Sequence, residues 1–128
     1  MRTMIQADKR TDWNLLFYKN DFKSPLTSEE AGSLAFPLEM VRLAPSASNK
    51  QPWRLLLKDG DVHFYEYKEP GYSDIFSYDI QRVDMGIAAA HFDFSLKEKG
   101  IKGHFNTASK PELKLPENME YVFSWIRE

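Results

Sequence analysis

The sequence contains no cysteine, which excludes disulfide scaffolds, thiolate nucleophiles and thiolate metal sites. It also lacks an apolar run of signal-peptide length near its N-terminus. No segment approaches the roughly 20 apolar residues that a membrane-spanning helix needs. We therefore expect a cytoplasmic protein without a membrane partner.

An excess of charge of one sign is lacking too. The 17 Lys and Arg residues are interspersed with 19 Asp and Glu residues, for a formal net charge of -2. A chain without a basic patch has no electrostatic footprint for nucleic acid, so we expect no such partner. The hydrophobic fraction of 42% in 128 residues predicts one folded domain over residues 1–128.

Metal-ligand spacing is also absent. The three histidines do not cluster, and we expect structural or solvated roles for them and no metal site: His63, His91 and His104. Asp79 and Asp84 lie near the start of a predicted helix. We interpret them as complements of the helix dipole and as surface charges, not as an acid–base pair. Arg82 forms either a salt bridge or an anion contact, and no catalytic side chain is assigned.

Residues 1–25 are polar apart from an apolar group at Trp13 and Leu15–Tyr18, where Thr11 or Asp12 would cap a short helix. We interpret this segment as an N-terminal arm. Because so large an apolar patch is unfavourable in water, the arm must pack against its own domain or against a partner.

Two helical regions follow from the pattern. A helix begins at about Ser28, is broken or kinked near Phe36 by Pro37, and continues in a second piece to Leu43. A longer helix covers residues 77–99, where apolar positions recur every three or four residues. Small residues in its middle, at 86–90, allow close packing, so this helix is expected to be central.

The rest of the pattern predicts strands. Residues 53–58 and 62–67 flank Asp59-Gly60-Asp61, a strong hairpin signal, and further strands are expected at 102–106 and 120–126. Alternation in the last strand would place Tyr121, Phe123 and Trp125 on one face. The expected fold is α+β, with a three- or four-stranded antiparallel sheet, packed helices and one long central helix.

The loop between the second helical piece and the first hairpin strand, residues 44–53, is rich in polar residues between Pro45 and Pro52. The two prolines restrict the backbone on both sides. Such a loop either holds hydrogen-bond donors for a ligand or is an ordinary connection, and its composition alone does not decide between them.

The segment RLAPSASNKQPW, Arg42–Trp53, closely resembles a flavin-contacting loop of the nitroreductase-like flavoproteins. The segment DIQRVDMGIAAAHFDFSLKEKGIKG, residues 79–103, is similar to the long central helix of that family. The likeness covers roughly residues 13–125 and is closest to the subgroup with duplicated half-sites in one longer chain. By this resemblance the chain is a partial domain, corresponding to the C-terminal half of the family fold.

The resemblance implies FMN as cofactor, contacted by Pro45, Ser46, Ala47 and Asn49 at an interface between two halves or subunits. Ser46 and Asn49 would give hydrogen bonds, whereas Pro45 and Ala47 would act through shape and backbone groups. Gln51 and Trp53 would brace the loop. The Arg-x-Ser-type segment with which the family grips the FMN phosphate is not recognisable in this sequence.

The function implied is that of an FMN-dependent NAD(P)H oxidoreductase of nitroreductase type, acting on nitro-aromatic, quinone or similar small acceptors. The alternative is a non-catalytic fragment or accessory interaction domain that kept the fold but lost flavin binding. We expect a homodimer, or pairing with a chain that supplies the missing half-site. The small residues from Gly86 to Ala90 are the expected interface.

Overall fold

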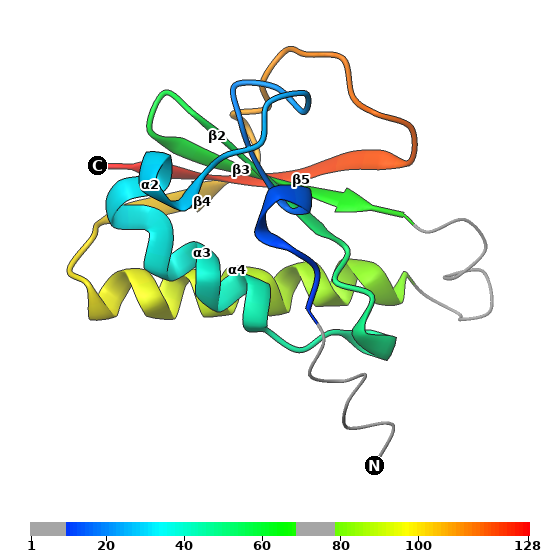
Figure 1. Cartoon of the computed structure of the whole chain (residues 1–128), viewed down its shortest axis with the longest axis horizontal. Coiled ribbons are helices and arrows are strands. Elements are labelled where there is room, and N and C mark those ends of the chain that lie inside the picture. Colours follow the sequence, from blue (N-terminus) through cyan, green and yellow to red (C-terminus); the bar gives the residue numbers. More distant parts are fainter. Residues whose placement is uncertain (1–9, 69–78) are drawn as a thin grey trace.

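The computed structural model describes residues 10–68 and 79–128, which form one mixed sheet with helices on one side (Figure 1). The sheet has five strands in the order β1-β2-β3-β5-β4. Their bounds are β1 Phe17–Lys19, β2 Trp53–Lys58, β3 Asp61–Tyr67, β4 Gly103–Asn106 and β5 Met119–Arg127. The helices are α2 Ser28–Ala31, α3 Ala35–Leu43 and α4 Ile80–Glu98, and short 3-10 turns are η1 Trp13–Leu15, η2 Gly32–Leu34 and η3 Ala47–Asn49. This is the expected α+β class.

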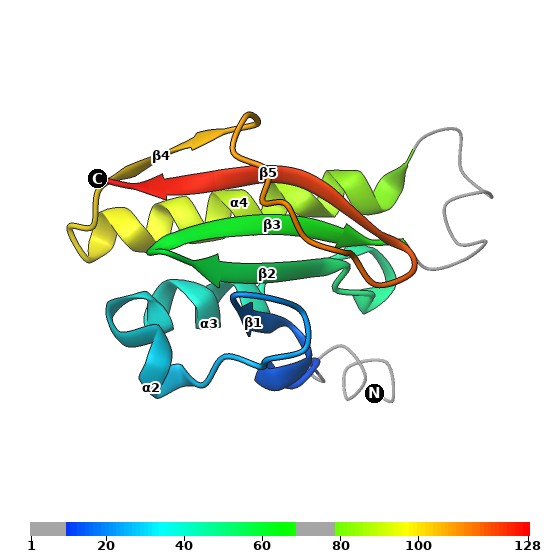
Figure 2. The same cartoon turned by 90° about the horizontal axis from the view of Figure 1, so that it is seen from above.

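Helices α3 and α4 cover one face of the sheet, and the long segments that precede α2 and β5 cover the other (Figure 1). Figure 1 shows α3 and α4 below the strands, and the segments that precede α2 and β5 above them. Seen from above in Figure 2, α4 runs along β3 and β5, so the long helix is central, as predicted. None of the helices in residues 10–68 and 79–128 is long and apolar enough to span a bilayer.

The first helical region is broken earlier than the sequence suggested. Thr27 and Glu30 form a reciprocal capping box that starts α2 at Ser28. The helix then stops at Gly32, whose φ of 58° is left-handed and costs glycine little. Pro37 lies in the first turn of α3, where its missing N–H has no helical partner to lose. The predicted break at Pro37 was therefore wrong.

Helix α4 is capped at both ends. The side chain of Asp79 accepts hydrogen bonds from the backbone N–H groups of Gln81 and Arg82, which confirms its interpretation as an N-terminal complement. Gly100 follows the last turn with a φ of 70°, and the N–H of Ile101 donates to the carbonyl of Leu96. The expected stop at Gly100 is confirmed.

The sheet is larger than predicted because the N-terminal arm contributes to it. The hairpin is confirmed, with Asp59 and Gly60 at φ values of 53° and 85° as a two-residue turn requires. The prediction of a purely antiparallel sheet was wrong, since β1 pairs with β2 in parallel. Leu16 and Phe17 are 0% exposed, so the described part of the arm packs on its own domain.

Strand β5 contains an irregularity that moves one aromatic ring to the other face. Its pairing with β3 jumps from Phe64↔Phe123 to Tyr65↔Tyr121, so Val122 has no partner in the β3 register. Tyr121 therefore lies on the loop-covered face, where its ring is 5.5 Å from that of Tyr65. The expectation that Tyr121 shares a face with Phe123 was wrong, because simple alternation does not account for a bulge.

The core lies between the sheet and the helices α3 and α4, and large aromatic side chains fill it. The ring of Phe92 on α4 contacts both Phe64 and Trp125, each at a centroid distance of 5.5 Å. Gly103 in β4 lies so close to Trp125 that a Cβ atom there would overlap the indole ring and the carbonyl of Ile126. The first residue of β4 therefore packs tightly against a core tryptophan.

Candidate functional site

The loop between α3 and β2 has an unusual backbone. Three of its non-glycine residues adopt left-handed conformations, Ser48 at φ 52°, Asn49 at 54° and Gln51 at 48°. Such conformations cost L-residues energy and persist only where the surroundings hold them in place. The loop therefore needs anchors.

One anchor is internal to the loop. The Ser46 hydroxyl oxygen accepts a hydrogen bond of 2.9 Å from the backbone N–H of Gln51. The N–H groups of Asn49 and Lys50 donate to the carbonyls of Ser46 and Ala47 at 3.0 and 3.1 Å. These bonds close residues 46–51 into a compact turn.

A second anchor is the side chain of Gln51, which is 1% exposed. Its Oε1 accepts 2.6 Å hydrogen bonds from the backbone N–H and the hydroxyl of Thr11, and its Nε2 donates to the carbonyl of Arg42 at 3.2 Å. One buried amide thus ties together the loop, the end of α3 and the N-terminal arm. Gln51 braces the loop, as expected.

A third anchor comes from α4 and corrects a prediction. Asp84 is not a surface charge, since it is only 3% exposed. Both of its carboxylate oxygens accept from the backbone N–H of Ala47, at 3.2 and 3.1 Å. Burial raises the pKa of Asp84, and the bond from Ala47 opposes that shift. The sequence pattern missed this contact because it joins residues 37 positions apart.

The four residues assigned to flavin lie together at the end of the α3–β2 loop nearest α4. Pro45 is exposed, whereas Ser46, Ala47 and Asn49 are half-buried. Because the Ser46 oxygen accepts from Gln51, its hydroxyl hydrogen remains available to donate to a ligand. The N–H of Ala47 is bound to Asp84, so Ala47 offers a ligand its methyl group.

Beyond the loop, α4 forms an ion pair with a buried carboxylate of the sheet. Glu66 in β3 is 0% exposed, and its Oε1 accepts from Nε of Arg82 at 2.6 Å. Burial raises the pKa of Glu66 against the opposing effect of Arg82. The salt-bridge interpretation of Arg82 is confirmed, although its partners are Glu66 and Glu120. Glu66 shares the inward alternation of Val62 and Phe64, and that was the only signal of its burial.

The outer face of α4 is apolar. Val83 and Phe94 are 53% and 70% exposed, and the exposed residues Gly86 and Ala90 lie between them at helical spacing. We call these four residues the α4 stripe. Ala88, which lies within the predicted interface Gly86 to Ala90, is on the opposite side of the helix and completely buried in the core. A contiguous apolar stripe on a long helix is typical of an interaction surface.

The profile of the family described as "Putative TM nitroreductase" matches residues 22–96. The chain belongs to this nitroreductase family. The matched range contains α3, the α3–β2 loop, the hairpin and most of α4.

A solved nitroreductase structure has a similar fold. It is the crystal structure of a "putative nitroreductase" from Thermotoga maritima, with a TM-score of 0.53 and 21% sequence identity. The alignment covers 93% of this chain and 42% of that chain, so this chain spans less than half the length of the nitroreductase it matches. At this identity the likeness shows the fold alone. A search of curated proteins found no match.

Proposed function

We propose that the chain is the part of an FMN-dependent oxidoreductase of nitroreductase type that places the α3–β2 loop against the flavin. Membership of the nitroreductase family supports the reaction class. The observation that carries the proposal is the anchoring of this loop by Gln51 and Asp84, which fixes its left-handed backbone. A rigid loop can hold a cofactor without losing further conformational freedom when it binds.

Each proposed contact has a physical role. Ser46 donates its free hydroxyl hydrogen, and Asn49 offers an amide with one acceptor and two donors. Pro45 and Ala47 contribute shape, because neither has a backbone N–H to give. The bound flavin would supply hydride transfer from NAD(P)H to a nitro-aromatic, quinone or similar acceptor, so the protein needs no catalytic triad.

The flavin lies at an interface in this proposal, formed by a second copy or by a chain that supplies the other half-site. The α4 stripe is the surface for that contact, since Gly86 and Ala90 are exposed and small. The apolar residues Leu16 and Phe17 of the N-terminal arm give no support for association, because they are buried in their own domain.

A non-catalytic interaction domain is the second candidate. The observation that favours it is that polar groups of the loop already have partners within the protein. The N–H of Gln51 donates to the Ser46 hydroxyl oxygen, and the N–H of Ala47 donates to Asp84 on α4. In that case the same anchors would preserve a fold whose loop no longer meets a cofactor.

The visible absorption spectrum of the purified chain separates the two candidates. After incubation with FMN and removal of free flavin, we expect retained flavin absorbance that bleaches on addition of NADH or NADPH and returns with a quinone. A protein that stays colourless at FMN concentrations far above the micromolar range would refute flavin binding by this chain alone or as a homodimer, and would support the interaction domain.

A further inference from the structure

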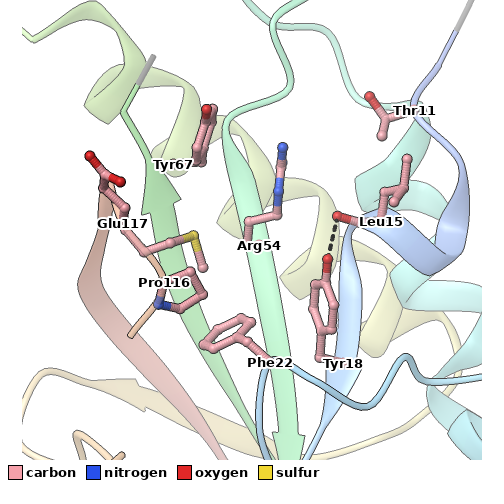
Figure 3. Close-up of a pocket in the computed structure, with 9 residues that line it drawn as sticks. Thr11, Leu15, Tyr18, Phe22, Arg54, Tyr67, Pro116 and Glu117 are labelled. Atoms are coloured by element: carbon pink, nitrogen blue, oxygen red, sulfur yellow. Dashed lines mark hydrogen bonds between the residues drawn. The ribbon is translucent and has the colours of Figure 1, made fainter. Parts of the chain in front are cut away.

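A separate cavity lies on the sheet face turned away from α3 and α4. Arg54 and Tyr67 reach it from β2 and β3, because they alternate with the core-facing residues of those strands. Its volume is about 300 Å³. Its lining includes Tyr18, Phe22, Arg54, Tyr67, Glu117 and Met119, and Figure 3 shows Arg54 in the middle of the labelled side chains.

The walls of this cavity are mostly aromatic and apolar. Tyr18, Phe22 and Tyr67 present rings, and Met119 adds a polarisable thioether. Tyr18 and Phe22 are already packed edge to face, at a centroid distance of 5.2 Å, and Tyr18 is tied by its hydroxyl to the carbonyl of Leu15. The lining therefore suits a flat ring and is held in place before any ligand arrives.

Arg54 is the polar centre of the cavity, and its guanidinium is fixed. Its Nη1 donates to the carbonyls of Gln51 and Trp53, each at 2.8 Å, and its central carbon lies 5.2 Å from the ring centroid of Tyr67. Burial lowers the pKa of Arg54. Arginine side chains stay protonated in proteins, so Arg54 is a cation.

Arg54 is partly buried and lacks a counter-charge among the described residues. Within residues 10–68 and 79–128, no carboxylate forms an ion pair with it, whereas Arg42 and Arg82 both have glutamate partners. A half-buried cation without an anion is unfavourable, and a planar guanidinium matches the two oxygens of a carboxylate. The remaining donors, Nε and Nη2, can serve that purpose.

We propose that this cavity binds a small planar aromatic carboxylate, with the carboxylate on Arg54 and the ring among Tyr18, Phe22 and Tyr67. The volume lies at the lower end of the range for ligand cavities, which favours a molecule of one ring. This site goes beyond the proposed flavin function and does not depend on it. Glu117, which is exposed, also lines the cavity and weakens binding of an anion.

Calorimetric titration of the flavin-free chain tests the proposal with three probes: benzoate, its uncharged isostere benzamide, and inorganic phosphate. We expect saturable binding of benzoate at least about tenfold tighter than that of benzamide, because hydrogen bonds between ionised groups are the stronger ones. Phosphate, which lacks a ring, should not bind measurably. Equal affinity for benzoate and benzamide, or tighter binding of phosphate, would overturn the assignment.

Variants separate the ligand contact from effects on folding. Arg54→Gln should lose the preference for benzoate over benzamide. Arg127→Gln should keep it, because the Arg127 guanidinium donates to Ser33 and does not line the cavity. If Arg54→Gln proves unstable, Glu117→Gln serves instead, because its side chain is exposed. It should tighten benzoate binding about two- to threefold and leave benzamide unchanged. Unaltered benzoate binding in Glu117→Gln, or a retained preference in a folded Arg54→Gln, would contradict the proposal.

Discussion

Replacing Asp84 tests whether α4 anchors the α3–β2 loop. In Asp84→Ala the N–H of Ala47 loses both of its acceptor oxygens, which lie at 3.1 and 3.2 Å in the native protein. Leaving a buried donor without a partner costs about 1–3 kcal/mol, so the free energy of unfolding should fall by that amount. Asp84→Asn keeps one side-chain oxygen for Ala47 and removes the buried charge. Its stability should stay within about 1 kcal/mol of the native value.

The pH dependence of stability tests the burial of the same side chain. The folded-state pKa of Asp84 is raised above its ordinary value of 3.8, so the folded chain binds this proton more tightly than the unfolded chain does. The contribution of Asp84 to stability therefore falls as the pH rises through the window above 3.8, and it recovers as the pH falls. Urea unfolding of the native protein and of Asp84→Asn, at pH values from about 4 to about 7, measures this difference in stability.

Because burial raises the pKa of Asp84, the native protein should gain stability relative to Asp84→Asn as the pH is lowered. The anchoring account predicts that Asp84→Ala, but not Asp84→Asn, increases the hydrogen-exchange rate of the Ala47 amide. Equal stabilities of the three proteins at every pH, with an unchanged exchange rate at Ala47, would refute the role assigned to Asp84.

Three further predictions concern the rest of the molecule. Gly103→Ala should lower the free energy of unfolding by about 1–3 kcal/mol, since its Cβ would overlap Trp125, and an unchanged denaturation midpoint would contradict that fit. Burial lowers the pKa of His63 below 6.5, so the free energy of unfolding should fall as the pH drops below 6.5, by at most about 1.4 kcal/mol per pH unit. Urea unfolding at several pH values should show a smaller slope for His63→Gln than for the native protein. Ala90→Arg should weaken self-association in sedimentation experiments without changing the melting temperature of the monomer, because position 90 is exposed; association equal to that of the native protein would exclude the α4 stripe as the interface.

Local signals predicted much of the fold. Asp59 and Gly60 specified the hairpin, Asp79 and Gly100 bounded the long helix, and short-range chemistry suffices for each of these features. The strand at Phe17–Lys19 was missed because three residues carry no recognisable alternation, and pairing with β2 decides their structure. The bulge at Val122 was missed for a similar reason, since register is set between strands.

For the candidate site, the sequence indicated the loop but not what holds it. The resemblance pointed to Pro45, Ser46, Ala47 and Asn49, and the two prolines suggested a restricted backbone. The anchors Gln51 and Asp84 act across long sequence separations, so no local pattern could reveal that Asp84 is buried. The cavity around Arg54 depends on three separate segments meeting over one face of the sheet, which pattern analysis does not address.

The left-handed backbone also changes how Asn49 should be tested. At φ 54° asparagine is tolerated, whereas alanine is strained, so Asn49→Ala would lose stability whether or not the side chain meets flavin. Asn49→Gly removes the amide and keeps the backbone conformation accessible. Asn20→Gly is the matched control, because Asn20 is exposed and has a φ of 66°.

The most direct test of the central claim, that the α3–β2 loop contacts flavin, is the thermal stabilisation produced by excess FMN in native protein, Asn49→Gly and Asn20→Gly. We predict a clear upward shift in the native protein and in Asn20→Gly. In Asn49→Gly the shift should be smaller and correspond to roughly tenfold weaker FMN binding, from the loss of one or two hydrogen bonds worth about 0.5–1.5 kcal/mol each. An identical FMN-induced shift in all three proteins would contradict the contact with Asn49, and no shift in any of them would contradict flavin binding by this chain.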